Sequence, residues 1–204
     1  MQNQTPTAPS GFVYFKPLYE QRLEMPEWMQ FLLANLIALL PFSLGLLLLW
    51  VPYQLYLAMG TPFALMPDLQ LAPFTSIVSG ILIFIASMLL HEWLHGLALQ
   101  AMGYKPVYYF KIGVLFAGLQ KGDYLSRVHY LIMTLTPLVV MSVTGFGVLL
   151  LLPPVYGRLL LIALLLNTAA SLGDLFVAVG VYRAPKTAVF TDDNGIQVFV
   201  PAAE

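Results

Sequence analysis

Long apolar runs constrain this chain more than any other feature of its sequence. An α-helix needs about 20 mostly apolar residues to cross the hydrocarbon core of a bilayer. Four segments reach that length, at about 28–51, 72–102, 128–152 and 158–182. Only 9% of the residues are charged, whereas a soluble domain carries roughly 25%. The sequence therefore predicts an all-α polytopic membrane protein with about four transmembrane helices.

The remaining composition excludes several kinds of chemistry. A net charge of −1 leaves no basic surface for nucleic acid. The absence of cysteine excludes disulfides and thiolate metal ligands. The first apolar run follows a polar lead of mixed charge, unlike the basic start of a secretory signal, so we expect it to be a retained helix. The predicted organisation is a lead (1–27), a four-span membrane domain (28–182) and a tail (183–204).

The basic residues predict the orientation of the chain in the membrane. Eight of the nine lie in the lead, in the connection after the second span, or in the tail: Lys16, Arg22, Lys105, Lys111, Lys121, Arg127, Arg183 and Lys186. Only Arg158 lies in a connection on the other side. Because cytoplasmic loops carry an excess of Lys and Arg, both termini are expected in the cytoplasm.

Two connections have the composition of β structure. The stretch 104–121 is rich in aromatic and β-branched residues and is interrupted by Gly113 and Gly118, which favours one or two strands at the membrane face. The tail places Asn194-Gly195 between two β-prone runs, a typical hairpin signal. Small β elements are therefore expected at the cytoplasmic face, either as part of the site or as surface additions without a catalytic role.

The second apolar segment contains the sequence HEWLH. His91 and His95 are four residues apart, so on a helix both imidazoles can reach one cation, and Glu92 is placed beside a water on that cation. A buried histidine is more often a hydrogen-bonded core residue. However, the chain has only three histidines, and an ionisable group inside a span costs about 2.5–3.5 kcal/mol and usually marks function. The motif therefore predicts a zinc site with Glu92 as general base.

A third protein ligand must come from elsewhere, because HExxH supplies two and a catalytic zinc uses three plus water. The candidates are Asp174 inside the fourth span, His129 at the start of the third, and Asp123 just before it. One face of the fourth span carries a polar stripe, with Asn167 at i, Ser171 at i+4 and Asp174 at i+7. A polar contact between helices explains serine and asparagine there, but it explains an aspartate less well.

Depth in the membrane favours Asp174 among these candidates. His95 lies seven residues before Met102, and Asp174 lies eight residues before Tyr182, near the expected inner ends of two spans that run in the same direction. At 1.5 Å per residue both lie about 10–12 Å from the cytoplasmic face. His129 lies at the inner edge of a span that runs the other way. Asp174 is therefore predicted as the third ligand, at a level that cytoplasmic water can reach.

These residues resemble those of the site-2 protease-like intramembrane metalloproteases, and most closely the bacterial family of putative zincin peptidases. Family members carry HExxH in one span and an aspartate ligand, with an asparagine upstream, in a later span. The resemblance implies that His91, His95 and Asp174 hold Zn²⁺, that Glu92 is the catalytic base, and that Asn167 orients the substrate or stabilises the oxyanion. It also implies a β element at the membrane face and a location in the bacterial plasma membrane.

One departure from the family concerns the second motif. The well-studied members have Asp-Gly at its end, whereas here Asp174 is followed by Leu175 and preceded by Gly173. The sequence also has no segment that resembles an accessory domain. The resemblance therefore implies the fold and the ligands, and it does not extend to a site-2 type of substrate.

The sequence and the resemblance together predict a zinc-dependent intramembrane endopeptidase. Its partners are the lipid bilayer and a membrane-protein substrate bound as an extended segment, which a strand edge in 104–121 could hold. Three alternatives stay open: a zinc hydrolase acting on lipid or a small amide, an inactive metal-binding scaffold, and a small transporter. An intact Glu92 argues against the scaffold, and four spans without a repeat argue against the transporter.

Overall fold

The computed structural model describes residues 8–18, 73–111, 114–152, 154–192 and 195–202, together with seven scattered residues between 29 and 58. The expected first span, 28–51, therefore lies mostly outside the described residues. So does most of the connection that follows it.

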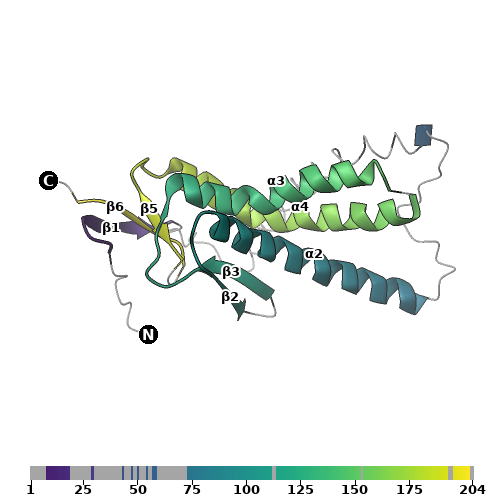
Figure 1. The fold of residues 1–204 in the computed structure, drawn as a ribbon, viewed down its shortest axis with the longest axis horizontal. Coiled ribbons are helices and arrows are strands. Elements are labelled where there is room, and N and C mark those ends of the chain that lie inside the picture. The colour runs from purple at the N-terminus through teal and green to yellow at the C-terminus, as the bar shows by residue number, and fades with distance from the viewer. Residues whose placement is uncertain are drawn as a thin grey trace. The chain divides into compact units, whose positions relative to one another are not determined.

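Three long helices dominate the described part of the chain (Figure 1). They are α2 (Pro73–Ala101), α3 (Arg127–Leu149) and α4 (Pro154–Arg183). Each contains a stretch that is long and apolar enough to cross a membrane: Val78–Ala101, Arg127–Leu149 and Leu159–Arg183. These stretches correspond to the second, third and fourth expected spans. The described residues thus support a multi-pass membrane protein with three candidate spans, and the first expected span lies mostly outside them.

The fold is mixed helix and strand rather than all-α. In the described part of the chain, six short strands accompany the helices: β1 (Phe12–Pro17), β2 (Pro106–Lys111), β3 (Val114–Leu119), β4 (Leu125–Ser126), β5 (Val189–Thr191) and β6 (Gln197–Pro201). β2 and β3 form an antiparallel hairpin in the stretch where strands were expected. β5 and β6 pair antiparallel on either side of Gly195, whose positive φ of 94° suits a tight turn. The sequence did not predict β1, which forms from the lead and pairs with β6.

The chain divides into two compact units, and the first comprises residues 1–26, 92–136 and 173–204. This unit holds all six strands, with the larger sheet ordered β1-β6-β5-β4. Its core is formed by side chains from the end of α2, the start of α3, the end of α4 and the larger sheet: Leu99, Leu125, Tyr130, Met133, Val181, Ala188, Phe190 and Val198. The sheet and the adjacent helix ends therefore share one hydrophobic core.

The second unit comprises residues 27–91 and 137–172 and contains the other parts of the three helices. α3 and α4 approach closely here, since a Cβ at Gly145 would collide with the side chain of Leu164. Glycine thus permits the close approach of these two helices. On α2, Ile81, Leu82 and Phe84 are each more than half exposed. Such outward apolar side chains suit contact with lipid.

Candidate metal centre

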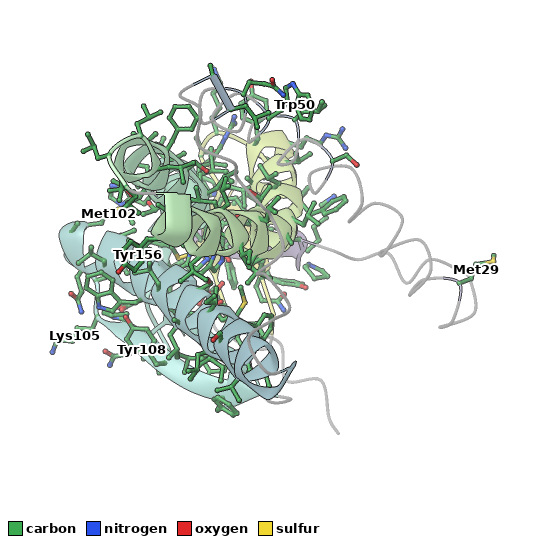
Figure 2. The ribbon with its side chains drawn as sticks, turned by 90° about the vertical axis from the view of Figure 1, so that its right-hand side faces the viewer. Met29, Trp50, Met102, Lys105, Tyr108 and Tyr156 are labelled. Carbon is green, nitrogen blue, oxygen red and sulfur yellow. The ribbon has the colours of Figure 1, made fainter. Side chains whose placement is uncertain are left out.

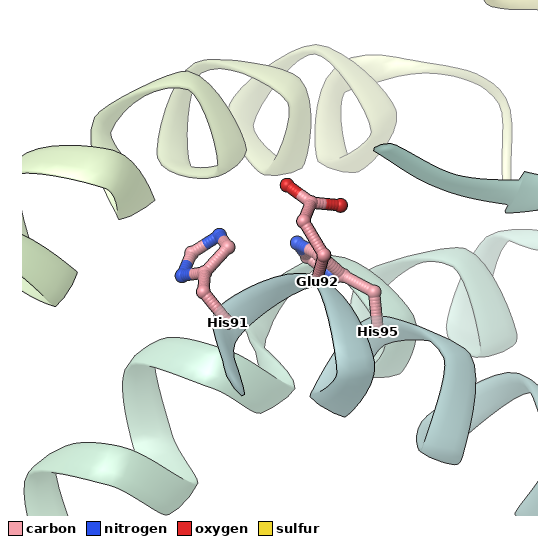
Figure 3. Close-up of side chains that lie close together, drawn as sticks. All are labelled: His91, Glu92 and His95. Atoms are coloured by element: carbon pink, nitrogen blue, oxygen red, sulfur yellow. The ribbon is translucent and has the colours of Figure 1, made fainter. Parts of the chain in front are cut away.

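The HExxH motif lies within α2, as its spacing predicted, and its three side chains converge on one side of the helix (Figure 3). One ligand atom from each of His91, Glu92 and His95 lies within 4.8 Å of the others. Both imidazoles are buried, with only 3% of His91 and 7% of His95 exposed. A helical spacing of four residues thus brings two imidazoles and a carboxylate close enough to hold or flank one metal ion.

In the first unit, a backbone carbonyl sets the tautomer of His95. Nδ1 of His95 lies 2.9 Å from the carbonyl oxygen of Met133. Because a carbonyl can only accept, Nδ1 must carry the proton and donate it, which leaves a lone pair on Nε2 of the neutral ring. A metal-binding histidine commonly donates its other ring N–H to a carbonyl in this way.

Nε2 of His95 faces the carboxylate of Asp174, with 3.4 Å between Nε2 and Oδ1. A lone pair and a carboxylate oxygen repel one another unless a proton or a cation lies between them. Two ligand atoms about 2.0–2.1 Å from a zinc ion, at the tetrahedral angle, are about 3.4 Å apart. The separation and the donor types therefore fit a zinc ion shared by His95 and Asp174.

In the second unit, His91 has a different partner. Its Nδ1 lies 2.9 Å from Oδ1 of Asn167 and donates to that oxygen. Asn167 is fully buried, and its Nδ2 donates to the carbonyl oxygen of Pro137 at 3.4 Å. Nε2 of the neutral His91 ring is therefore also the acceptor atom. The structure places Asn167 beside an imidazole, a contact that the sequence did not predict.

The carboxylate of Glu92 contacts the β2–β3 hairpin. The backbone N–H of Ala117, on β3, donates to Oε2 of Glu92 at 2.8 Å. Antiparallel strands alternate between residues whose N–H faces the partner strand and residues whose N–H faces away. The N–H of Ala117 therefore faces away from β2, on the outer edge of β3. The predicted catalytic base and the predicted strand thus meet directly in the first unit.

Asp192, just after β5, holds the same strand edge and was not singled out in the sequence. Its Oδ2 accepts the N–H of Leu119, two residues beyond Ala117, at 3.3 Å, and its Oδ1 accepts the hydroxyl of Tyr130 at 2.5 Å. Burial raises the pKa of Asp192, and these two hydrogen bonds offset part of that rise. Burial, followed by the charges of Asp192 and Glu92, also raises the pKa of Tyr109.

A tyrosine of the hairpin packs on the motif helix. A Cβ at Gly96, the residue after the HExxH motif, would overlap the hydroxyl of Tyr108. Figure 2 labels Tyr108, which lies within β2, and Lys105, which lies just before that strand. Glycine at this position therefore lets β2 lie close against α2 beside the candidate metal ligands.

The other two candidate ligands have different surroundings. His129, in the first turn of α3, makes an edge-to-face contact with the ring of Tyr104, with 6.0 Å between ring centroids. Asp123 lies in the turn after β3, where its N–H donates to the carbonyl of Gln120. Among the described residues, the cluster of close donor atoms contains neither of them, and it does not contain Asp174, whose printed contact is with His95.

Two buried histidines at helical spacing with an acid beside the first, on a helix long enough to span a membrane, define a zincin-type metal site. The chain belongs to the putative zincin peptidase family, whose model matches residues 84–189, slightly more than half of its 204 residues. The match includes the HExxH turn, the β2–β3 hairpin, α3 and α4. No curated protein and no solved structure matches the chain.

Proposed function

We propose that this protein is a zinc-dependent intramembrane endopeptidase of the site-2 protease-like type. The observation that carries the proposal is the position of Nε2 of His95, 3.4 Å from Oδ1 of Asp174, beside the HExxH cluster. His91, His95 and Asp174 are the proposed zinc ligands. Zinc bound there would lower the pKa of a bound water to about 7 and polarise a substrate carbonyl.

Glu92 is the proposed general base. Its carboxylate takes a proton from the attacking water and then supplies a proton to the leaving amine. The hydrogen bond from the Ala117 N–H to Oε2 fixes the orientation of this carboxylate. The carboxylate stands on the same helical turn as both imidazoles, so its proton acceptor is positioned before substrate binds.

The outer edge of β3 is the proposed substrate-binding element. Its N–H groups at Ala117 and Leu119 face away from β2 and donate to carboxylates, so their positions suit pairing with an additional strand. An extended substrate carbonyl that replaced Oε2 as acceptor for the Ala117 N–H would release that carboxylate oxygen for proton transfer. The helical backbone of a membrane protein hides its peptide bonds, so the substrate would bind as an unwound segment.

The proposed location is the bacterial plasma membrane, with both termini in the cytoplasm. The support is the distribution of basic residues together with the three membrane-length helices. Asn167, buried against His91, is proposed to hold that imidazole in place. A role in orienting substrate or stabilising the oxyanion would require its amide to exchange these partners.

A comparison of wild type with Glu92→Gln tests the proposed reaction. The amide keeps the shape of the side chain but cannot take a proton from water. We expect both purified proteins to bind zinc, and only the wild type to generate new peptide termini when it is incubated with membrane proteins. Mass spectrometry of the termini measures this. Equal cleavage by Glu92→Gln would overturn the role of Glu92, and hydrolysis of lipid without any peptide cleavage would overturn the peptidase assignment.

A further inference from the structure

A proline lies inside α3, four residues after the carbonyl that orients His95. In an α-helix the carbonyl of residue i accepts the N–H of residue i+4. Pro137 has no N–H, so the carbonyl of Met133 lacks its helical donor. In the structure this carbonyl accepts the Nδ1–H of His95 at 2.9 Å. Thus the sequence removes a helical hydrogen bond at the position where an imidazole needs an acceptor.

We propose that Pro137 is a positioning residue for the metal centre, because it leaves the Met133 carbonyl available to the His95 ring. This inference rests on the proposed function, in which Nε2 of His95 binds zinc. A carbonyl oxygen has two lone pairs, so a restored N–H at position 137 would weaken the bond to His95 without abolishing it. The expected loss of zinc affinity is therefore graded, about tenfold, at the lower end for an outer partner of a metal ligand.

His91 provides an internal control for this effect. Its Nδ1–H donates to Asn167, whose amide donates to the carbonyl of residue 137 rather than depending on the missing N–H. Alanine at position 137 keeps that carbonyl. A specific effect on the Met133 carbonyl therefore alters the ring of His95 and leaves the ring of His91 unchanged, whereas a general distortion of α3 alters both.

The test is Pro137→Ala, studied in the full-length protein in detergent with ¹⁵N-labelled histidine. The chain has only three histidines, so the ring nitrogens can be assigned one by one with His→Gln variants. We expect metal-free wild-type His95 to carry a proton on Nδ1 toward the Met133 carbonyl, with a further proton between Nε2 and Asp174 in place of the metal. Pro137→Ala should weaken the Nδ1 hydrogen bond and shift the His95 ring toward a mixture of tautomers. The His91 signals should not move. Zinc affinity, measured by competition with a chelator, should fall about tenfold.

Stability separates this role from a merely structural one. Alanine restores a helical hydrogen bond and removes the clash of the proline ring, so the melting temperature of metal-free Pro137→Ala should not fall. Pro154→Ala is the matched control, because Pro154 is the first residue of α4 and no helical carbonyl precedes it by four residues. This control should change neither the His95 tautomer nor the zinc affinity.

Three results would overturn the inference: an unchanged His95 tautomer in folded Pro137→Ala, an unchanged zinc affinity, or equal shifts of His91 and His95. Failure of the proposed function is distinguishable, because it would appear as a wild-type protein that binds no zinc. The tautomer measurement is made without metal and so tests the role of Pro137 even in that case.

Discussion

The two imidazoles of the candidate site are oriented by different chemical groups. His91 donates to a buried side-chain amide, and His95 donates to a backbone carbonyl. Both bonds leave Nε2 as the acceptor atom of a neutral ring. Because the two orienting groups belong to different residues, a substitution at one of them should affect its own histidine first.

The sequence predicted the residues with side-chain chemistry better than their partners. The spacing of His91, Glu92 and His95 was sufficient to place them together, because a helix brings residues four apart onto one face. Asp174 was selected by its depth and its residue type, and the structure places it against His95. The Met133 carbonyl could not be selected, since a backbone acceptor has no residue signature. A proline four residues later was the one available signal.

β3 carries an element-scale prediction about pH, because Asp192 is buried against it. The raised pKa means that folded Asp192 holds its proton more tightly than the unfolded chain does. The free energy of unfolding should therefore fall as pH rises from the ordinary aspartate pKa to the raised one. The asparagine of Asp192→Asn does not ionise, so the part of the decrease in unfolding free energy that comes from Asp192 should disappear. Thermal unfolding in detergent across that pH range measures the difference.

Wild type and Asp192→Asn should converge in stability toward the acid end, where the aspartate is protonated in both states. Parallel curves across the whole range would mean that Asp192 does not titrate as described. Asp123→Asn is a suitable control, because Asp123 lies in a turn of the same unit and is separate from the Asp192 hydrogen bonds.

The helices were predicted more accurately than the sheet. The second expected span, 72–102, became α2 (Pro73–Ala101), since a long apolar run specifies a membrane helix by local sequence alone. β1 was not predicted, because a strand depends on its partner, and β6 lies at the other end of the chain. Tyr108 against Gly96 is also a contact between segments whose approach no local pattern specifies.

For the whole molecule, the distribution of charge predicts an orientation that can be measured. Lys16, Lys121 and Lys186 belong to the unit that holds the six strands, and Arg158 belongs to the other. The chain has no cysteine, so single cysteines can be introduced without background. A membrane-impermeant thiol reagent added to intact cells should label position 158 and spare positions 121 and 186. Strong labelling at position 121 would reverse the proposed topology.

The most direct test of the zinc site is the metal content of the purified protein. Elemental analysis should find one zinc per chain in the wild type and in His129→Ala. Asp174→Ala should lose most of its zinc, because it removes one of three protein ligands, and the combined His91→Ala and His95→Ala variant should bind none. Full zinc in Asp174→Ala together with loss of zinc in His129→Ala would contradict the proposed ligands. A wild-type protein that contains no zinc, and binds none when zinc is added back, would contradict the metal centre itself.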